Sequence, residues 1–368
     1  MSETMRCDIV VIGGGAAGLG VAAALAPEAE VVLIEAEDAL GHHASGRSAA
    51  LYEPGYGHAA IAAMSRRSRP FFEEIGAFTP RGLLVIIPKG EEETHAGELA
   101  DPRVREISVA EARALVPPLR SEVVGRCGLI EDAFDLDTDL MLQHFARTIR
   151  RHRGRIELGA PARSLRHAGR LWHVETPRGR FAAPIVINAA GAWADEIARL
   201  AGLAPLGLQP MRRSVARIAL PAGIDAHRWP MLLGAGESWY AKPDAGALLV
   251  SPAEEDPTEP HDAWADDMRL AEGIARFQEM IDIEVRRLVA SWGGLRTFAP
   301  DRVPVIGFDP RAEGFFWLAG QGGSGMMSAP GQAVLVGEMI RGTVSFIGAD
   351  LAASIAPDRL LRDGRSPI

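Results

Sequence analysis

A glycine-rich turn near the start of the chain constrains its fold more than any other feature. Residues 13–18 read Gly-Gly-Gly-Ala-Ala-Gly and fit the pattern G-x-G-x-x-G. An apolar β-branched run, Cys7–Ile12, precedes the turn, and an Ala- and Leu-rich stretch, Ala16–Ala26, follows it. A second apolar run, Val31–Ile34, comes next. The order strand, turn, helix, strand predicts a βαβ unit of a buried parallel sheet.

The three glycines that define the pattern, Gly13, Gly15 and Gly18, each have a physical role. Gly13 permits the tight turn, Gly15 lets a phosphate approach the backbone, and Gly18 lets the helix pack on the strand. The helix begins at Ala16 and Ala17, where free N–H groups and the positive end of the helix dipole attract a pyrophosphate. The turn therefore predicts a dinucleotide-binding site at the end of the first strand.

The acidic residue that ends the second strand completes this pattern. Glu35 stands where a carboxylate holds ribose hydroxyls in dinucleotide-binding folds, and it would serve NAD or FAD equally. Three later segments favour FAD. Residues 41–50 carry small residues and hydroxyls that suit close packing on phosphate, ribitol and flavin, and residues 187–193 end a strand in small residues. Residues 316–326 aim another helix N-terminus at the same space, where it would stabilise the negative charge of reduced flavin.

These segments define the candidate FAD-contacting residues beyond the first turn. They are Ala44, Ser45, Arg47, Ser48, Ala50, Ala162, Ala190, Gly191, Trp193, Gly322, Gly323, Gly325 and Met326. Outside residues 13–18 and residues 320–325, the segment already assigned to the flavin, the chain has no G-x-G-x-x-G unit for a nicotinamide cofactor. We therefore expect the electrons to come from the substrate.

The rest of the chain predicts a second unit that interleaves with the first. The whole chain has 368 residues, which is enough for two or three compact units. Helices are expected at 111–115, 139–153 (after the natural caps Asp137 and Thr138), 193–201 and 267–280, and strands at 81–88, 184–188, 214–220, 238–242, 247–251 and 315–321. The expected fold is α/β: a Rossmann-like FAD-binding domain (1–78, 140–205, 299–368) interleaved with a mixed, mostly antiparallel substrate domain with helices (79–139, 206–298).

Composition and charge exclude several classes of protein. A hydrophobic share of 47% and a charged share of 24% are those of an ordinary globular protein. The net charge is −9 and the basic residues are scattered, so no nucleic-acid partner is expected. Cys7 and Cys127 are too few for a disulfide framework or a cysteine-rich metal site, and they favour a reducing, cytoplasmic location. Residues 9–26 lack charges as a signal peptide or a short membrane span does, but their glycines stand at motif spacing and a strand-like run follows, so no integral membrane segment is expected.

Together the motifs carry a family resemblance that extends over nearly the whole chain. The matching stretches are Gly46-Arg47-Ser48-Ala49-Ala50, Tyr56-Gly57, residues 188–193, 206–214, 229–232, 240–246, 294–296, 313–317 and 321–323. The chain resembles the FAD-dependent amino-acid oxidoreductases of the D-amino-acid oxidase, glycine oxidase and sarcosine oxidase group. It is most similar to D-amino-acid dehydrogenases of the bacterial D-arginine dehydrogenase type.

The resemblance implies how a substrate would be held. In that family an amino acid lies against the flavin, and arginine and tyrosine side chains hold its α-carboxylate. The matching residues are Tyr56, Arg213, Tyr240 and Arg296. Arginine offers a fixed fork that matches a carboxylate, and tyrosine adds neutral donors. The anchored carboxylate would direct the Cα–H at flavin N5, giving the imino acid by hydride transfer without an obligatory protein base.

Each of these residues also has an alternative interpretation. Strand alternation directs only one of Arg212 and Arg213 inward, and the motif position favours Arg213. Arg296 could be a surface arginine, and Tyr56 and Tyr240 could be core tyrosines. An N-methyl amino acid or a 2-hydroxy acid would use the same clamp. The alternative from a different functional class is a flavoprotein that has lost catalysis and acts as a binding or assembly module. Enantiomer, oxidase or dehydrogenase chemistry, electron acceptor and oligomeric state stay open.

The side-chain end of the substrate site is expected to differ from that of arginine-preferring relatives. The polar residues that surround the pocket there are replaced here by Leu51, Glu53, Met327 and, with a looser match, Gly82. This favours neutral or hydrophobic D-amino acids, because a buried cation without a partner is costly. Glu53 is either a replacement carboxylate or a solvated loop acid beside Pro54.

No metal and no covalent flavin link are expected from the sequence. His42 and His43 have no cysteine or carboxylate at metal-ligand spacing along the chain, so we expect them to pack near the flavin or face solvent. Cys7 and Cys127 are distant from the glycine motifs. FAD is therefore expected to be bound non-covalently, and His43 is the one plausible exception.

Overall fold

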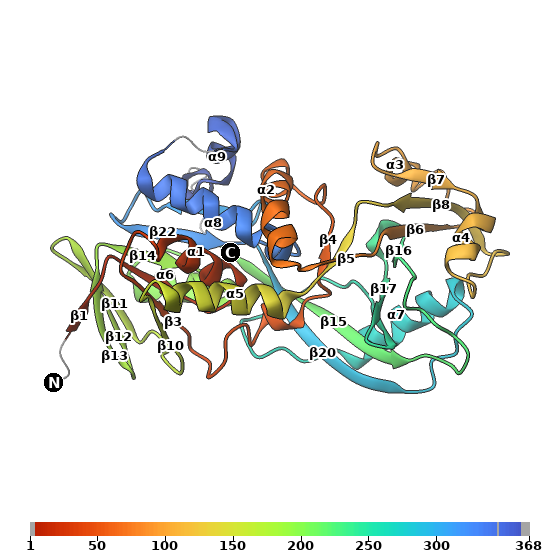
Figure 1. The fold of residues 1–368 in the computed structure, drawn as a ribbon, viewed down its shortest axis with the longest axis horizontal. Helices are drawn as coiled ribbons and strands as arrows, with labels where there is room; N and C mark the ends of the chain where they lie inside the picture. The colour runs from red at the N-terminus through yellow and green to blue at the C-terminus, as the bar shows by residue number, and fades with distance from the viewer. Residues whose placement is uncertain (1–3, 344–345, 362–368) are drawn as a thin grey trace.

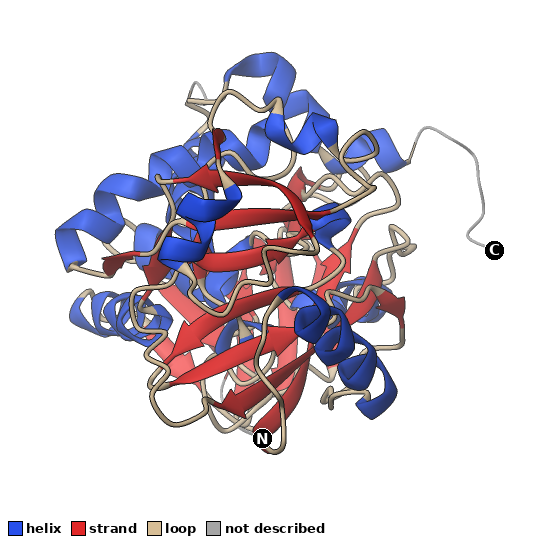
Figure 2. Cartoon of the chain, turned by 90° about the vertical axis from the view of Figure 1, so that its right-hand side faces the viewer, coloured by secondary structure: helices blue, strands red, loops and turns tan. Residues whose placement is uncertain are grey.

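The fold is built on a six-stranded sheet at one end of the molecule and a nine-stranded sheet at the other (Figure 1). The computed structural model describes residues 4–343 and 346–361. Residues 1–3, 344–345 and 362–368, which belong to the predicted FAD-binding domain, lie outside the described residues. In the view of Figure 2, strands fill the middle of the molecule and most helices lie around them.

The six-stranded sheet contains the predicted βαβ unit at its centre. Its order is β10-β3-β2-β14-β22-β21, and all neighbours run parallel except β21 and β22. The strands are β2 (Ile9–Ile12), β3 (Val31–Ile34), β10 (Arg155–Glu157), β14 (Ile185–Asn188), β21 (Val305–Phe308) and β22 (Phe315–Ala319). Every residue of β2 and β3 is buried, as expected of parallel strands that are covered on both faces.

A layer of helices covers one face of this sheet. Its main members are α1 (Ala16–Leu25), α2 (Ala59–Ile75), α5 (Thr138–Arg151) and α8 (Gly325–Arg341), and α9 (Gly348–Ile355) with the short turn η4 (Pro357–Leu360) lies beside them. The Asp137 carboxylate accepts a hydrogen bond from Leu140 N at 2.8 Å, which is the predicted cap of α5. α2 is not among the elements expected from the sequence. It contains Pro70, a residue that normally breaks helices and that lies here on the exposed side.

A second sheet and a short helix cover the opposite face. The four-stranded sheet has the order β1-β13-β12-β11, and its residues Trp172 and Phe181 pack against Trp317 of the central sheet. Its strands are β1 (Thr4–Arg6), β11 (Ser164–Ala168), β12 (Leu171–Thr176) and β13 (Gly179–Ala183); the turn η2 (Gly191–Trp193) leads into α6 (Ala194–Leu200). The three layers together bury the strands whose ends form the candidate site.

The nine-stranded sheet contains the strands expected from residues 206–298. Its order is β19-β15-β18-β17-β16-β6-β8-β7, and β20 pairs with β15 outside this path. The strands are β6 (Leu83–Pro88), β7 (Arg105–Ile107), β8 (Val124–Ile130), β15 (Gln209–Ala219), β16 (Met231–Gly234), β17 (Tyr240–Asp244), β18 (Ala247–Ser251), β19 (Asp256–Pro257) and β20 (Leu288–Phe298). Helices α4 (Val109–Leu115) and α7 (Asp267–Met280) pack on it; α3 (Ala96–Leu99) and the turn η3 (Ala235–Glu237) complete the unit.

A small three-stranded sheet lies where the chain passes between the two large ones. It consists of β4 (Leu51–Tyr52), β9 (Phe134–Leu136) and β5 (Phe78–Pro80). The six-stranded sheet takes its strands from residues 9–34, 155–188 and 305–319, and the nine-stranded sheet from 83–130 and 209–298. The α/β fold class is confirmed, and the two sheets do interleave along the chain. The exact domain boundaries remain a prediction.

The uncharged stretch at 9–26 is a buried strand, turn and helix in the core of this fold. Across the described ranges, 4–343 and 346–361, no helix has the length and apolar composition needed to cross a membrane.

Two glycines of α1 give a matched test of this packing. A Cβ at Gly18 would lie 1.9 Å from the carbonyl oxygen of Gly13, whereas a Cβ at Gly20 would find its nearest neighbour at 3.4 Å. We expect Gly18→Ala to lower the free energy of unfolding by about 1–3 kcal/mol, because helix and turn must move apart. Gly20→Ala should be neutral or stabilising by up to about 1 kcal/mol. Thermal or denaturant unfolding of both variants measures this, and equal losses would contradict the assigned contact.

Candidate active site

The candidate residues meet in one cavity at the carboxyl ends of the parallel strands. The cavity has a volume of about 480 Å³ and lies between the six-stranded sheet and strands β15, β17 and β20. Ligands of open α/β sheets bind at this edge. Its lining includes Gly13, Gly15, Ala16, Ala17, Glu35, Ala44, Ser45, Arg47, Ser48, Ala162, Ala190, Gly191, Trp193, Arg213, Tyr240, Arg296, Gly322, Gly323, Gly325 and Met326. Gly18, Ala50, Glu53 and Tyr56 are candidates outside this lining.

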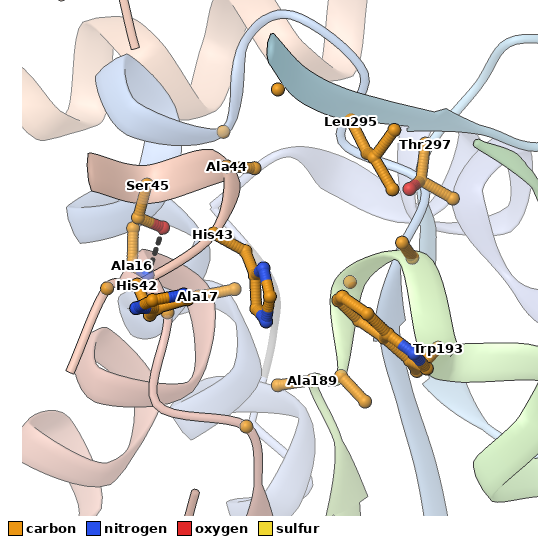
Figure 3. Close-up of a pocket in the computed structure, with 18 of the residues that line it drawn as sticks. Ala16, Ala17, His42, His43, Ala44, Ser45, Ala189, Trp193, Leu295 and Thr297 are labelled. Carbon is orange, nitrogen blue, oxygen red and sulfur yellow. Dashed lines mark hydrogen bonds between the residues drawn. The ribbon is translucent and has the colours of Figure 1, made fainter. Parts of the chain in front are cut away.

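The first glycine turn leaves no room for side chains. Gly13 has φ +112°, and a Cβ there would lie 2.4 Å from the carbonyl oxygen of Ala189 on the neighbouring strand end. A Cβ at Gly15 would lie 3.1 Å from Ser45 Oγ. Ser45 Oγ in turn accepts a hydrogen bond from Ala16 N at 3.0 Å (Figure 3). The N–H of Ala16, which the sequence led us to expect to be free, is therefore bonded to Ser45. Gly13, Gly15 and Ala17 still line the cavity at the start of α1, which fits a bound pyrophosphate.

Glu35 is held at the edge of this cradle by backbone amides. Its carboxylate accepts hydrogen bonds from Gly14 N at 2.5 Å and from Glu37 N at 2.8 Å, one on each oxygen. A carboxylate has about four acceptor positions, so each oxygen can accept a further hydroxyl hydrogen. The position and the remaining acceptor capacity suit the ribose contact predicted for Glu35.

Residues 41–49 and 190–193 form opposite walls of the cavity. In Figure 3, His43 and Trp193 project into it from the two sides, and their ring centroids are 4.5 Å apart. The first wall includes the turn η1 (Ala44–Arg47) and is followed by Ala50, which adopts φ +57°. Positive φ at a residue with a side chain costs energy and marks a constrained backbone. Ser48 Oγ supports this bend by accepting a hydrogen bond from Ala50 N at 3.0 Å.

The second glycine turn brings the nine-stranded sheet against the start of α8. A Cβ at Gly323 would lie 2.9 Å from the guanidinium of Arg296, and a Cβ at Gly322 would lie 2.3 Å from the Phe298 ring. Gly322 N also donates a hydrogen bond to the carbonyl oxygen of Thr297 at 2.9 Å. Arg296 is therefore placed directly over the glycine turn that leads into α8.

Arg213 and Arg296 lie on one face of the sheet, on neighbouring strands. In the β15–β20 register, Arg213 is opposite Gly294 and Met211 is opposite Arg296, so the two arginines are diagonal neighbours. Arg213 is buried, with 5% of its surface exposed, and burial together with the charge of Arg296 lowers its pKa. Arg212 instead pairs with Asp256 and Asp266, outside the cavity lining. The structure thus directs Arg213 inward and Arg212 away.

The two inward arginines differ in their partners. Arg213 Nε donates to the carbonyl oxygen of Glu254 at 2.7 Å, and its terminal nitrogen lies 3.2 Å from Glu255, a carboxylate shared with Arg302. For Arg296, the part of the chain that the structure describes contains no hydrogen-bond acceptor or carboxylate within bonding distance. Tyr240 is also buried at the cavity wall, near enough to Arg213 to influence its charge. Two cations and a phenol therefore lie together at the cavity, and the Glu255 and Glu254 carboxylates are near Arg213.

Tyr56 lies close to the same charges although it is outside the cavity lining. The residue as a whole is 38% exposed, so its phenol is only partly enclosed. Its pKa is raised, first by burial and then by Glu237, whereas Arg296 and Arg213 oppose the shift. The phenol therefore remains protonated at neutral pH and can serve as a hydrogen-bond donor.

Glu53 has a partner within the chain. Its carboxylate is ion-paired with Arg103 and accepts a hydrogen bond from Gly55 N at 2.9 Å. Both residues line a second cavity, of about 290 Å³, that contains no other candidate site residue. Leu51 packs against the apolar cluster that contains Tyr240, Met327 lies in the helix-layer core, and Gly82 is a turn residue with φ +73°. Leu51, Met327 and Gly82 do not belong to the lining of the first cavity. Glu53 is thus neither solvated, as one interpretation expects, nor unpaired.

The histidines lie closer to carboxylates than their spacing in the sequence indicates. His43 Nε2 is 2.9 Å from Glu37 Oε1, and both His42 and His43 lie 3.7 Å from Asp262. His43 thus has a hydrogen-bond partner in Glu37, and the potential ligand atoms of Glu37, His42 and His43 all lie within 4.8 Å of one another. The folded chain therefore brings a carboxylate to the two histidines that the sequence spacing does not place there. The expectation that the site holds no metal remains a prediction.

Several lining residues are not among those expected from the sequence. They are Ala160, Pro161, Glu196, Ile197, Leu200, Val215, Leu295 and Thr297, among others. Ala160 and Pro161 follow β10, a three-residue strand that pairs with β3 at the sheet edge. The strand is short and polar, so its only sequence signal is its position after α5.

Comparisons with known proteins agree with this geometry. The family model "DAO: FAD dependent oxidoreductase" matches residues 8–339. The bifunctional protein ThiO/ThiG of Nostoc sp. is 25% identical over 364 residues, which cover 91% of this chain and 53% of that protein. This chain spans about half the length of the curated relatives that it matches by sequence.

Solved structures share the fold over nearly the whole chain. Glycine oxidase from Geobacillus kaustophilus has a TM-score of 0.80 at 21% identity, covering 93% of this chain and 96% of that one. L-proline dehydrogenase from P. horikoshii has a TM-score of 0.84 at 22% identity, covering 98% and 99%. With the family match over most of its length, the chain belongs to the DAO family of FAD-dependent oxidoreductases, and FAD is its cofactor.

Proposed function

We propose that this protein oxidises an α-amino acid, with D-amino acids as the first candidates, and transfers the electrons to FAD. The observation that carries the proposal is Arg296, a guanidinium beside the glycine turn of α8 whose hydrogen-bond donors have no partner among the described residues. Arg213 adds a second positive charge on the same sheet face. A bidentate carboxylate is the ligand that such a fork of donors recognises.

The work of this chain's own residues is to bind and orient the substrate. Arg213 and Arg296 hold the α-carboxylate, while Tyr240 and the protonated Tyr56 donate to it from the sides. A carboxylate fixed at two oxygens leaves its α-carbon little freedom, and such positioning lowers the barrier without a general base. Bound FAD supplies the acceptor for the hydride. Glycine oxidase and L-proline dehydrogenase, two proteins of the same fold, are named for amino-acid substrates.

We place the side-chain end of the substrate beside an apolar cluster of which Tyr240 and Ala49 line the cavity. Tyr240 packs in a cluster with Leu51, Leu83, Ile130 and Met231. Glu53, the one carboxylate expected near this end, is already neutralised by Arg103. A cationic substrate side chain would have to displace Arg103 or remain unpaired, and either is costly. This supports a preference for neutral side chains.

Anaerobic mixing of the holoenzyme with single amino acids tests the proposed activity. We expect at least one D-amino acid to bleach the flavin absorbance, because oxidation of the substrate must reduce the cofactor when oxygen is absent. The panel should include L enantiomers, N-methyl amino acids and 2-hydroxy acids. Bleaching by 2-hydroxy acids alone would replace the proposal, and no bleaching by any of them would favour a flavoprotein without this catalysis.

The clamp is tested by Arg296→Leu, with Arg212→Leu as the control. Loss of one charged donor to the carboxylate should cost about 2–5 kcal/mol of substrate interaction and lower kcat/KM accordingly. FAD content should stay near that of the wild type. Arg212 pairs outside the cavity, so Arg212→Leu should change kcat/KM much less. Normal KM and kcat in Arg296→Leu would show that the clamp is misassigned.

The attachment of FAD is tested by acid precipitation of the holoenzyme. Cys7 and Cys127 are buried, and burial raises their pKa values to about 12 and about 11, so neither is a reactive thiolate. Neither belongs to the cavity lining. We expect all yellow colour in the supernatant. Colour retained in the pellet would indicate a covalent link and would direct attention to His43, which does line the cavity.

The side-chain preference is tested by steady-state kinetics on D-arginine, D-methionine, D-leucine and D-phenylalanine. We expect kcat/KM for D-arginine to be below those of the three neutral substrates, because Glu53 is already paired with Arg103. A value for D-arginine far above the others would overturn this. Glu53→Gln should then remove that advantage, which would identify Glu53 as the specificity residue.

A further inference from the structure

The guanidinium of Arg47 is used almost entirely by the protein itself. Nε donates to the carbonyl oxygen of His42 at 3.2 Å, and one terminal nitrogen donates to the carbonyl oxygens of Ala263 at 2.7 Å and Gly293 at 3.1 Å. The other terminal nitrogen is ion-paired with Asp262. An arginine has five N–H donors, so these four bonds leave no two-donor face for a phosphate. Arg47 lines the cavity, but its donors bond to His42, to residues 262–263 and to Gly293 of β20.

Two of the acceptors of Arg47, Asp262 and the carbonyl oxygen of Ala263, lie on a segment that packs against the cavity wall. We call residues 258–266, between β19 and α7, the strap. Its ends are tied to β15 by hydrogen bonds from Thr258 N to the carbonyl oxygen of Pro210 and from Asp266 N to Ser214 Oγ. In its middle, Ala263 packs against Leu295 and Ala192, two residues that line the cavity. Movement of the strap would therefore alter the cavity wall.

Asp262, in the strap, contacts three residues that line the cavity. It pairs with Arg47 and lies 3.7 Å from both His42 and His43. The hydrogen bond from Arg47 is the main cause that lowers its pKa. Asp262 is 64% exposed, and exposed pairs contribute little individually, so the carbonyl bonds of Arg47 carry more of the attachment.

We propose that Arg47 and Asp262 are positioning residues that hold the strap and β20 against residues 41–50, and thereby keep the cavity in the form that retains FAD. Gly293, one of the acceptors of Arg47, stands three residues before Arg296 on β20. The same contacts therefore fix the substrate arginines relative to the cofactor side of the cavity.

The rival explanation is that Arg47 acts directly on a phosphate of FAD. The two explanations differ in what they expect of Asp262 and of a lysine at position 47. Under direct action, Asp262 competes for Arg47, so Asp262→Asn would leave FAD binding unchanged or tighten it. Arg47→Lys would keep most of the affinity, because lysine also binds phosphate. Under positioning, a single ammonium cannot bridge two carbonyls and a carboxylate, so Arg47→Lys loses affinity as Arg47→Gln does.

The experiment measures FAD release on dilution of the holoenzyme, followed by the fluorescence of the free cofactor. We expect the Kd for FAD to rise about tenfold in both Arg47→Gln and Arg47→Lys. In Asp262→Asn it should rise in the same direction by about twofold to threefold, since the residue is exposed. Arg126→Gln is the control. It breaks a two-bond pair with Glu106 on the nine-stranded sheet, outside the cavity lining, and should not change the Kd.

A second measurement does not depend on FAD affinity. Trp264, in the strap, is 66% exposed and is a chymotrypsin site. Cleavage after Trp264 in the holoenzyme should be faster in the Arg47 variants and in Asp262→Asn than in Arg126→Gln. The proposal is overturned if Asp262→Asn binds FAD as tightly as the wild type or more tightly, or if Arg47→Lys restores wild-type affinity. It is also overturned if cleavage after Trp264 is unchanged in every variant. Asp262→Asn keeps the test decisive should the Arg47 variants fail to fold.

Discussion

Two like charges held close together on one sheet face are the constraint around which this site is arranged. Arg213 and Arg296 repel each other, and burial adds to the cost of charging Arg213. Glu255 offsets part of this cost but is shared with Arg302. The remainder would be relieved when an anion enters the cavity. The long β15–β20 ladder provides the rigidity that such an arrangement needs, because its register sets the spacing of the two guanidinium groups.

The parts of the fold that were predictable from the sequence are those with strong local signals. The βαβ unit has apolar runs and glycines at fixed spacing, and its strands and helix fall at or within the expected ranges. The prediction for α7 coincides with the observed Asp267–Met280, and that for Ala247–Ser251 coincides with β18. In these segments local preference and tertiary packing favour the same conformation.

Elements were missed where tertiary packing overrides the local signal. α2 carries Pro70 and a run of arginines, yet it forms because Ala60, Met64 and Phe72 are buried against the other helices. Within the site, the inward direction of Arg213 follows from alternation together with motif position. The ion pair of Glu53 with Arg103 and the bonds of Arg47 to the strap had no sequence signal. Glu53 and Arg103 are 50 positions apart in the sequence, and Arg47 is more than 200 positions from the strap, so only the folded chain brings them together.

The interleaving of the two sheets has a consequence for how the protein is made. β22 lies beside β14 in the six-stranded sheet, yet its residues, 315–319, follow β14 by more than 120 positions in the sequence. Every strand of the nine-stranded sheet precedes it. During synthesis the ribosome therefore releases the complete nine-stranded sheet before the six-stranded sheet can close. The cavity lining includes Met326, so the cofactor can be fully enclosed only after residues 315–326 have left the ribosome.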